Sequence, residues 1–207
     1  MRELDLPDYL FLLIGIVVQI LVFGFSNLGI ISLISGLAGI VAVVLVSQRR
    51  NIQYLFSFIQ LFTYLYLAWQ EKLYAEVGEN IFYFVTMLYG MWSWFRNSDK
   101  GIVESRSLGK IKLTGVFGVM LASGIILWRI LAETSDTQPF LDSFTTVPAF
   151  IAQILLILRY REQWIFWGII DVGSIFMWWI AGDWCMVVQY IFWTANCIYG
   201  WNLWKTR

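Results

Sequence analysis

The chain has 207 residues, of which 59% are hydrophobic, and its 14 basic residues are balanced by 14 acidic ones. A soluble domain of this length could not bury the apolar surface that a mean hydropathy of +0.70 implies, so the composition excludes a water-soluble globular protein and predicts a membrane protein covered by lipid. The chain contains no histidine, which removes the commonest general base and the commonest metal ligand and argues against an enzyme.

Eight apolar segments follow one another along the chain, each close to the roughly 20 residues that a membrane-spanning helix needs. The first apolar run, from Tyr9 to Phe25, follows one Arg and three acidic residues, rather than the basic n-region and cleavage site of a signal peptide, so we expect a retained helix. The predicted fold class is therefore all-α, an integral membrane protein with eight transmembrane helices. These helices are predicted at residues 8–25, 28–46, 52–70, 74–95, 111–131, 145–159, 163–181 and 183–204.

Basic residues are concentrated at both termini and in alternate loops between these segments. Twelve of the 14 lie on one side of the predicted membrane, and only Lys72 and Arg129 lie on the other. Cytoplasmic loops are enriched in Lys and Arg, and one missed or invented span would scramble this division. The N- and C-termini are therefore both predicted to be cytoplasmic.

The sequence also repeats itself, without a gap, at a spacing of 110 residues. The copies cover the second to fourth and the sixth to eighth predicted helices, so they start four helices apart and share one orientation. Such a duplication is typical of a transporter whose substrate site lies between the halves near the bilayer midplane. The identical residues pair Arg49 with Arg159, Gln53 with Gln163, Phe56 with Phe166, Trp69 with Trp179, Phe82 with Phe192, Tyr89 with Tyr199, Gly90 with Gly200 and Trp94 with Trp204.

This repeat predicts a 1+3+1+3 arrangement, in which two parallel three-helix bundles are joined by a linker helix. The predicted segments are an extra N-terminal helix at 1–26, the first bundle at 27–96, a basic loop, linker helix and outer loop at 97–140, and the second bundle at 141–207.

Most of the 12 tryptophans are predicted to form aromatic belts, because indole rings settle at the depth of the lipid headgroups. Trp167 and Trp193 lie too deep in their helices for a belt. The predicted belts hold Trp92, Trp94, Trp201 and Trp204 on the cytoplasmic side and Trp69, Trp179 and Trp184 on the outer side.

Polar residues gather at mid-depth in the predicted helices. Asp171 is the one formal charge near the centre of a span, where a carboxylate costs about 2.5–3.5 kcal/mol and needs a partner or a watery cavity. It shares a helical stripe with Trp164 and Trp167, and we expect this stripe to face away from lipid. A polar network that only joins helices is the alternative, since such hydrogen bonds contribute about 0.6 kcal/mol each. The candidate substrate-binding residues are Gln60, Tyr64, Tyr83, Thr86, Thr146, Gln153, Trp164, Trp167, Asp171, Trp193, Asn196 and Tyr199.

The two copies differ most at this depth. Scaffold positions are alike while the midplane has diverged, as an asymmetric substrate would require. The unlike pairs are Leu61 and Asp171, Thr86 and Asn196, Ser57 and Trp167, and Val43 and Gln153.

The second copy carries a recognisable series of motifs. It contains Asp142-x-x-Thr145-Thr146, then Gln153, then Glu162-x-Trp164-x-x-Trp167-x-x-x-Asp171, and finally Tyr199-Gly200-x-x-x-Trp204. This series resembles the PnuC family of vitamin transporters, whose best-known members carry nicotinamide riboside. The resemblance covers the second to eighth predicted helices and is strongest over residues 142–204.

The resemblance implies two three-helix bundles with a linker helix, as in SWEET sugar transporters but with different helix connectivity, assembled as a homotrimer in the bacterial inner membrane. It implies import of nicotinamide riboside for NAD biosynthesis by facilitated diffusion, followed by trapping when a cytoplasmic riboside kinase phosphorylates the nucleoside. No cofactor, metal or nucleic-acid partner is expected. Related members take thiamine, so thiamine or another nucleoside remains an alternative substrate.

The candidate residues suit such a ligand. Trp164 and Trp167 fit the cationic ring, by cation–π contact, or the cytoplasmic gate. Gln60, Gln153 and Asn196 fit the carboxamide or the sugar. Asp171 fits a ribose hydroxyl or the positive charge, and it leaves a proton-coupled carrier open.

Two other classes of protein remain as alternatives, a lipid-modifying enzyme built on Asp171 and a channel or receptor. The only cysteines, Cys185 and Cys197, are too far apart for a compact metal motif, and no nucleotide-binding signature is present. Saturable uptake with counterflow would separate a carrier from both classes.

Overall fold

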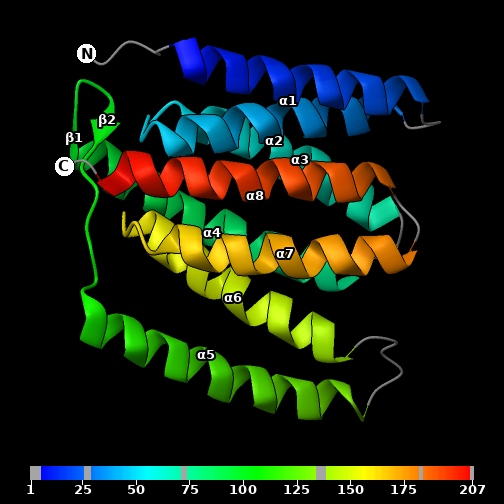
Figure 1. The fold of residues 1–207 in the computed structure, drawn as a ribbon, viewed down its shortest axis with the longest axis vertical. Helices are drawn as coiled ribbons and strands as arrows, with labels where there is room; N and C mark the ends of the chain where they lie inside the picture. The colour runs from blue at the N-terminus through cyan, green and yellow to red at the C-terminus, as the bar shows by residue number, and fades with distance from the viewer. Residues whose placement is uncertain (1–5, 26–28, 71–73, 134–138, 182–183, 206–207) are drawn as a thin grey trace. The chain divides into compact units, whose positions relative to one another are not determined.

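The computed structural model describes residues 6–25, 29–70, 74–133, 139–181 and 184–205. Within these ranges it contains eight α-helices and one two-stranded sheet (Figure 1). The helices are α1 (Leu6–Phe25), α2 (Ile30–Ser47), α3 (Gln53–Gln70), α4 (Tyr74–Arg96), α5 (Lys110–Leu131), α6 (Pro139–Ile157), α7 (Gln163–Ala181) and α8 (Trp184–Lys205).

The eight predicted helices are confirmed, and one bound differs clearly from its prediction. Helix α6 begins at Pro139 rather than at residue 145. Proline fits the first turn of a helix, where its missing N–H has no partner to lose, and Asp142 in the same turn interacts favourably with the helix dipole. Residues 139–144, which were predicted to lie before the helix, therefore form its first turns.

Three of these helices are long and apolar enough to cross a membrane by themselves. They are α1 over Asp8–Phe25, α2 over Ile30–Ser47 and α5 over Lys110–Leu131. Helices α6 and α7 contain shorter apolar stretches, Asp142–Ile157 and Gln163–Phe176. Among the described residues, the other helices of the two repeat copies are therefore less apolar than α1, α2 and α5.

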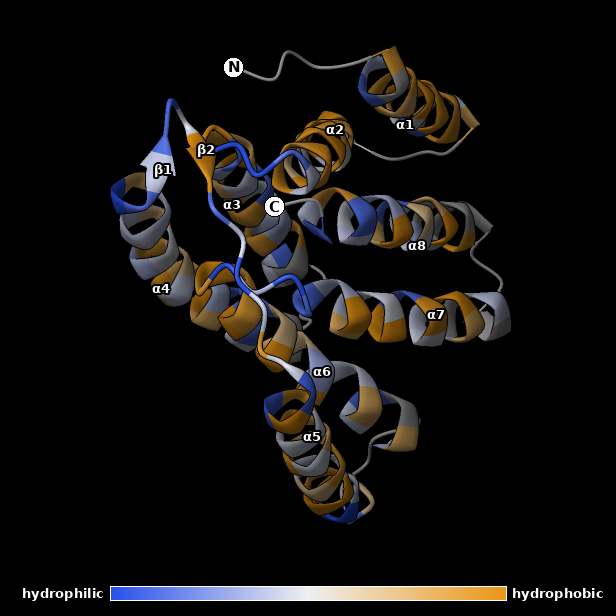
Figure 2. Cartoon of the chain, turned by 60° about the vertical axis from the view of Figure 1, so that its left-hand side comes forward, coloured by the Kyte–Doolittle hydropathy of each residue, from blue (hydrophilic) through white to orange (hydrophobic). Residues whose placement is uncertain are grey.

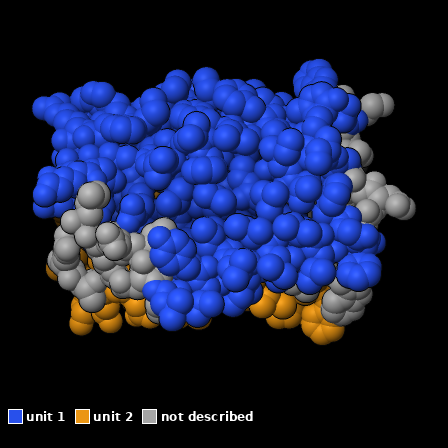
Figure 3. Space-filling model, turned by 90° about the horizontal axis from the view of Figure 1, so that it is seen from above, with its two compact units in different colours: residues 1–104 blue, residues 105–207 orange. Residues whose placement is uncertain are grey.

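The chain divides into two compact units, residues 1–104 and 105–207, which Figure 3 distinguishes by colour. In the first unit α1 packs on α2, α2 on α3 and α3 on α4; in the second, α5 packs on α6, α6 on α7 and α7 on α8. Helices that follow one another in sequence are thus neighbours within each unit. This division places α5 with the second unit, and the 1+3+1+3 arrangement stays a prediction.

Polar contacts attach α1 to α2. The Nε2 amide of Gln48 donates to the carboxylate of Asp8, and both side chains are buried. The amide of Gln19 occupies the space where a side chain at Gly36 would lie. Lipid tails provide no hydrophobic drive for helices to associate, so small residues and buried hydrogen bonds of this kind hold them together.

A short hairpin, absent from the predicted all-α fold, follows α4. Strand β1 (Ser98–Asp99) pairs antiparallel with β2 (Ile102–Val103), and the turn residues Lys100 and Gly101 both have positive φ angles, of 49° and 81°. A two-residue turn with this backbone matches the twist of paired strands. In Figure 2 the turn between the strands and parts of the segment after β2 are coloured as hydrophilic, whereas β2 itself is hydrophobic. The strands are too short to show a hydrophobic alternation in the sequence.

The turns that follow α2 and α6 have the same geometry. Arg49 and Arg159 adopt left-handed φ angles of 59° and 67°. The next amide in each turn donates to a carbonyl five residues back, Arg50 to Leu45 at 3.0 Å and Tyr160 to Leu155 at 2.8 Å. This pattern is a Schellman motif, which satisfies carbonyls that the helix end would otherwise leave without partners.

An aromatic pair lies at the same place in each unit. The rings of Tyr54 and Trp94 meet edge to face at 5.6 Å, and those of Trp164 and Trp204 do so at 6.0 Å. Trp94 is 0% exposed and Trp204 is 1% exposed. The prediction that these two tryptophans belong to an aromatic belt is therefore wrong. Each sits in the last turn of its helix and faces the start of the preceding helix instead of lipid.

The other predicted belt residues behave differently. Trp69, Trp92 and Trp179 are each more than half exposed, and Trp201 is half-buried. The guanidinium groups of Arg96 and Arg161 lie over the rings of Trp92 and Trp201, at 5.3 and 5.1 Å. The side chain of Trp184 falls outside the described residues.

Candidate functional site

Asp171 lies on α7 inside the second unit and is 3% exposed. The thiol of Cys197 on α8 donates a hydrogen bond to its Oδ2 at 3.3 Å. Asn196, next to this thiol in sequence, and Ser174, three residues after the carboxylate, are also buried. The carboxylate therefore has a partner from the neighbouring helix, a cysteine that was not among the candidate site residues. One polar link thus joins α7 to α8 at the middle of both helices.

Trp164 stands at the start of α7 and is buried. A Cβ atom at Gly200 on α8 would lie 2.5 Å from carbons of its indole ring, so glycine is required there for the two helices to approach. The contacts with Gly200 and Trp204 give Trp164 a packing role. Its indole Nε1 is buried without a hydrogen-bond partner among the described residues, and its predicted role in substrate binding stays a prediction.

The two tryptophans that were predicted to lie deep are both half-buried. Trp167 is on α7, one turn before Asp171. Trp193 is on α8, where its ring meets that of Tyr190 edge to face at 5.2 Å. The indole Nε1 of Trp193 is buried, and the structure gives it no hydrogen-bond partner within the described part of the chain. It is a donor that a polar ligand could use.

Gln163 is a candidate that the sequence analysis did not select. It is fully buried, and neither its amide oxygen nor its amide nitrogen has a partner among the described residues. At the equivalent place in the first unit, Gln53 accepts a hydrogen bond from Ser57 at 2.7 Å. The second copy has Trp167 where the first has Ser57, so this glutamine has lost that partner. Comparison of the two copies could have found it.

Four of the predicted site residues belong to the first unit. The amide of Gln60 on α3 lies against Gly39 on α2, where a Cβ atom would come within 2.9 Å of its nitrogen. On α4, the hydroxyl of Thr86 donates to the carbonyl of Phe82 at 2.8 Å, and the Tyr83 hydroxyl donates to Glu79 at 3.1 Å. These contacts occupy the polar groups locally, and Tyr64 is half-buried on α3.

The remaining predicted residues lie in the second unit. Gln153 is buried on α6, Thr146 is half-buried on the same helix, and Tyr199 is half-buried on α8. Helices α6 and α8 both pack on α7, which carries Asp171. A hydrogen bond brings together Asp171 and Cys197, and a ring contact brings together Trp164 and Trp204.

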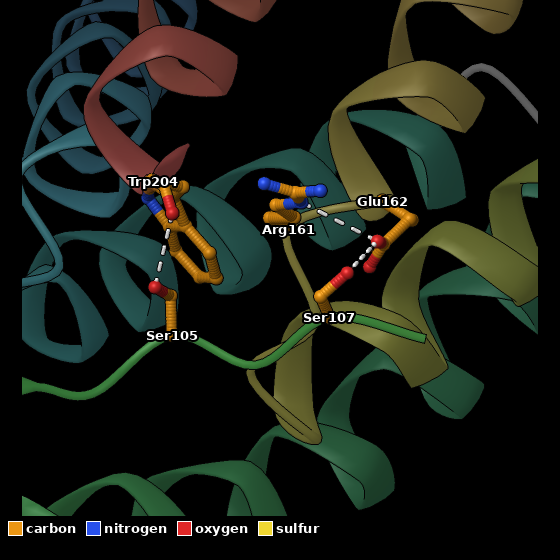
Figure 4. Close-up of polar contacts among 5 residues, drawn as sticks. All are labelled: Ser105, Ser107, Arg161, Glu162 and Trp204. Carbon is orange, nitrogen blue, oxygen red and sulfur yellow. Dashed lines mark hydrogen bonds and ion pairs between the residues drawn. The ribbon is translucent and has the colours of Figure 1, made fainter. Parts of the chain in front are cut away.

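A polar cluster holds the turn between α6 and α7 beside the end of α8 (Figure 4). The Ser107 hydroxyl donates to Glu162 Oε1 at 2.7 Å, and Arg161 Nε lies 3.4 Å from the same oxygen. The Ser105 hydroxyl donates to the carbonyl of Trp204 at 3.1 Å. Glu162, part of the motif that was singled out in the sequence, therefore binds neighbouring protein groups. The cluster fixes the start of α7, where Gln163 and Trp164 stand.

The described residues contain no group of three or more His, Cys, Asp or Glu side chains that could hold a metal ion. The polar chemistry of the second unit is instead that of hydrogen bonding. It offers the carboxylate of Asp171, the carboxamide of Gln163 and the indole N–H of Trp193, and the last two have no partner among the described residues. Such groups suit a small polar aromatic ligand better than a reaction that needs a general base.

Comparison with known proteins gives a consistent set of relatives. The sequence matches the family described as "Nicotinamide mononucleotide transporter" over residues 29–206. A protein of Haemophilus influenzae named nicotinamide riboside transporter PnuC is 32% identical over 179 residues, which cover 84% of this chain and 78% of that protein. A protein of the same name from Neisseria mucosa is 27% identical, and the match covers 95% of this chain and 80% of that one.

A solved structure agrees with these matches. The crystal structure of the vitamin B3 transporter PnuC is similar to this chain with a TM-score of 0.83 and 25% sequence identity. The superposition covers 99% of this chain and 93% of the other. The likeness therefore includes α1, which lies outside the residues that the family match covers.

Proposed function

This chain belongs to the nicotinamide mononucleotide transporter family, and from that premise we propose that it imports nicotinamide riboside. As a member of this family it is a multi-pass membrane transporter and not an enzyme. The relatives from Haemophilus influenzae and Neisseria mucosa are both named for nicotinamide riboside. One observation in the structure carries the proposal. The interior of the second unit holds buried polar groups, at Gln163 and Trp193, that have no partner among the described residues, and a bound riboside would supply partners for them.

The proposed roles follow from the chemistry of the ligand. The cationic nicotinamide ring lies against the indole of Trp167, where cation–π attraction contributes about 0.5–2 kcal/mol. The carboxamide and the ribose bond to Gln153, Asn196 and the amide of Gln163. Asp171, already bonded to Cys197, accepts from a ribose hydroxyl or balances the charge of the ring.

The phosphorylated nucleoside is not a substrate in this proposal, although the name of the family refers to the mononucleotide. A phosphate needs a cation to balance it, and the helices place no Lys or Arg at mid-depth. Asp171 would repel the phosphate. The kinase product therefore stays inside the cell, which gives the transport its direction.

The mechanism that we propose is facilitated diffusion followed by trapping. Vesicles that contain the purified protein should equilibrate nicotinamide riboside without accumulating it, whether or not a pH or sodium gradient is imposed. Nicotinamide mononucleotide should not enter, and thiamine serves as the competing vitamin. Accumulation above the outside concentration that disappears in Asp171→Asn would contradict the proposal and make this residue a proton carrier. Preferential uptake of thiamine would change the substrate but not the mechanism.

The proposed setting is the bacterial inner membrane, with both termini in the cytoplasm and three copies of the chain in the assembly. The distribution of basic residues supports the orientation, and the family resemblance supports the trimer. A reporter that is active only in the cytoplasm should be active when fused after Arg207 and inactive when fused at Asp183. The opposite result would overturn the orientation of both units.

A further inference from the structure

A cavity of about 640 Å³ lies in the first unit, and none of the residues assigned to transport lines it. Its walls come from the turn before α3, the first part of α3, the last part of α4 and the hairpin turn between β1 and β2. All of these elements belong to residues 1–104 and are described in the structure. The cavity is therefore a feature of one unit, whatever the position of the other.

One end of the cavity is positively charged. Arg50 and Lys100 line it, and no acidic residue is among the residues of its wall. The cavity also lies at the amino end of α3, where the helix dipole favours an anion. A negatively charged group is therefore the natural occupant of this end.

Two buried polar groups in the same wall have no partner among the described residues. They are the Oδ1 atom of Asn51 and the hydroxyl of Tyr54, and both side chains are more than nine-tenths buried. The Nδ2 atom of Asn51 donates to Ser98 at 2.7 Å, so the amide is held and its oxygen keeps one orientation. The wall thus includes, besides its two cations, an amide oxygen held in one orientation and a hydroxyl, for both of which a ligand would supply a partner.

The rest of the wall is apolar. Leu55 and Phe58 on α3 and Met91 and Phe95 on α4 line it. Leu55 and Phe95 are each more than half exposed. In a membrane protein such an exposed apolar surface borders lipid tails.

The corresponding place in the second unit lacks this combination. Tyr160 stands where the first unit has Arg50, and Glu162 where it has Ile52. The carboxylate of Glu162 is bonded to Ser107 and Arg161. The basic and apolar lining is therefore not a by-product of the shared turn, and it is specific to the first unit.

We propose that this cavity binds an anionic phospholipid. The phosphodiester lies between Arg50 and Lys100 and accepts a hydrogen bond from the Tyr54 hydroxyl. A headgroup hydroxyl, such as that of phosphatidylglycerol, donates to Asn51 Oδ1, and an acyl chain follows Leu55 and Phe95. Only a lipid joins a negative headgroup to an apolar chain in this way, whereas inorganic phosphate would leave the apolar wall unused.

Native mass spectrometry of the purified full-length protein tests this proposal with phosphatidylglycerol and phosphatidylcholine as probes. The wild type should bind phosphatidylglycerol at least tenfold more tightly than phosphatidylcholine. The double variant Arg50→Gln, Lys100→Gln should lose that preference. The matched control Lys110→Gln, Lys112→Gln removes the same charge from exposed residues of the second unit and should keep it.

A second variant tests the apolar wall without changing charge. Leu55→Trp fills part of the cavity from a position that is exposed and should tolerate a larger side chain, and it should weaken phosphatidylglycerol binding at least fivefold. Inorganic phosphate at millimolar concentration should not displace the lipid. Three results would overturn the proposal. The first is the same preference for phosphatidylglycerol in the double variant and the wild type, and the second is displacement of the lipid by inorganic phosphate. The third is a change of oligomeric mass in the lipid-free double variant, which would identify a second copy of the chain as the occupant. Substrate uptake is not measured, so these outcomes are separate from the proposed transport function.

Discussion

The two units end alike and differ inside. Each has a left-handed arginine after its first repeated helix and a buried edge-to-face aromatic pair one turn farther on. In the interior, Leu61 and Met87 of the first unit, both buried, stand where the second unit has Asp171 and Cys197. The likeness at the ends shows what the architecture requires. The difference inside shows what it leaves open.

The stability of the fold does not explain why the second unit has Asp171 and Cys197 at these positions. A leucine and a methionine can be buried without leaving a polar group in need of a partner, whereas a carboxylate inside a membrane costs free energy even with a partner. The polar interior of the second unit is thus the part of the molecule for which function is the simpler explanation. Changes that exchange residues between the units can test this division.

The largest expected effect is a loss of stability when the aromatic pair that both units share is disrupted. Trp204→Ala and Trp94→Ala should each lower the free energy of unfolding by about 3–5 kcal/mol, because each removes a fully buried indole ring and leaves a cavity. The exposed or half-buried neighbours provide the controls, and Trp201→Ala and Trp92→Ala should cost less than about 1 kcal/mol. Thermal unfolding of the detergent-solubilised variants measures both. Equal losses of stability in the buried and exposed variants would show that the aromatic pairs do not stabilise the fold.

The next effect concerns the interior. Trp167→Ser gives the second unit the residue of the first, and it should weaken nicotinamide riboside binding by more than tenfold, about 1.4 kcal/mol. The control is Trp179→Ala, which changes an exposed indole on the same helix and should leave the affinity within twofold. Calorimetry on the purified variants gives both values. An unchanged affinity in Trp167→Ser would show that this ring is not part of the site.

A smaller effect separates the two equivalent glutamines. Gln163→Leu should weaken substrate binding about threefold to tenfold without lowering stability, because its amide has no partner to lose in the free protein. Gln53→Leu should do the reverse, with a loss of about 1 kcal/mol in stability and an unchanged affinity, because its oxygen accepts from Ser57. The same calorimetric and unfolding measurements apply. Identical behaviour of the two variants would mean that Gln163 has a structural role only.

The smallest effect concerns the segment before α5. Ser105→Ala removes one hydrogen bond to the carbonyl of Trp204, and it should lower the free energy of unfolding by about 0.5–1 kcal/mol with no change in substrate affinity. Thr114→Ala is the matched control, since this exposed hydroxyl bonds only within its own helix at Lys110. A substantial loss of affinity in Ser105→Ala would show that the segment acts on the site as well as on the fold.

Much of the fold could be predicted from the sequence because apolar segments of sufficient length have few alternatives to helices. Seven of the eight helices begin close to their predicted positions, and α6 begins earlier because proline was not recognised as a helix start. The place of a residue along its helix could also be predicted. The direction in which it faces around the helix could not, which is why Trp94 and Trp204 were placed at a lipid-facing surface.

The site was predictable only in part, for a related reason. The polar stripe on α7 follows from helical spacing within one segment, and its members Asp171 and Ser174 are buried. The hydrogen bond from Cys197 depends on how α8 is rotated against α7, which one sequence does not specify. Gln163 was missed because what distinguishes it is an amide without a hydrogen-bond partner among the described residues. That property can be recognised only when the neighbouring side chains are known.

The contact between Gly200 and Trp164 constrains the order in which these positions can change during evolution. A methyl group at position 200 would overlap the indole ring, so a larger residue there is tolerated only after position 164 has become smaller. The two sites should therefore covary among relatives, with a large aromatic residue opposite glycine and a smaller one opposite alanine or serine. Paths in which Gly200 mutates first pass through a poorly packed intermediate, and selection should remove them.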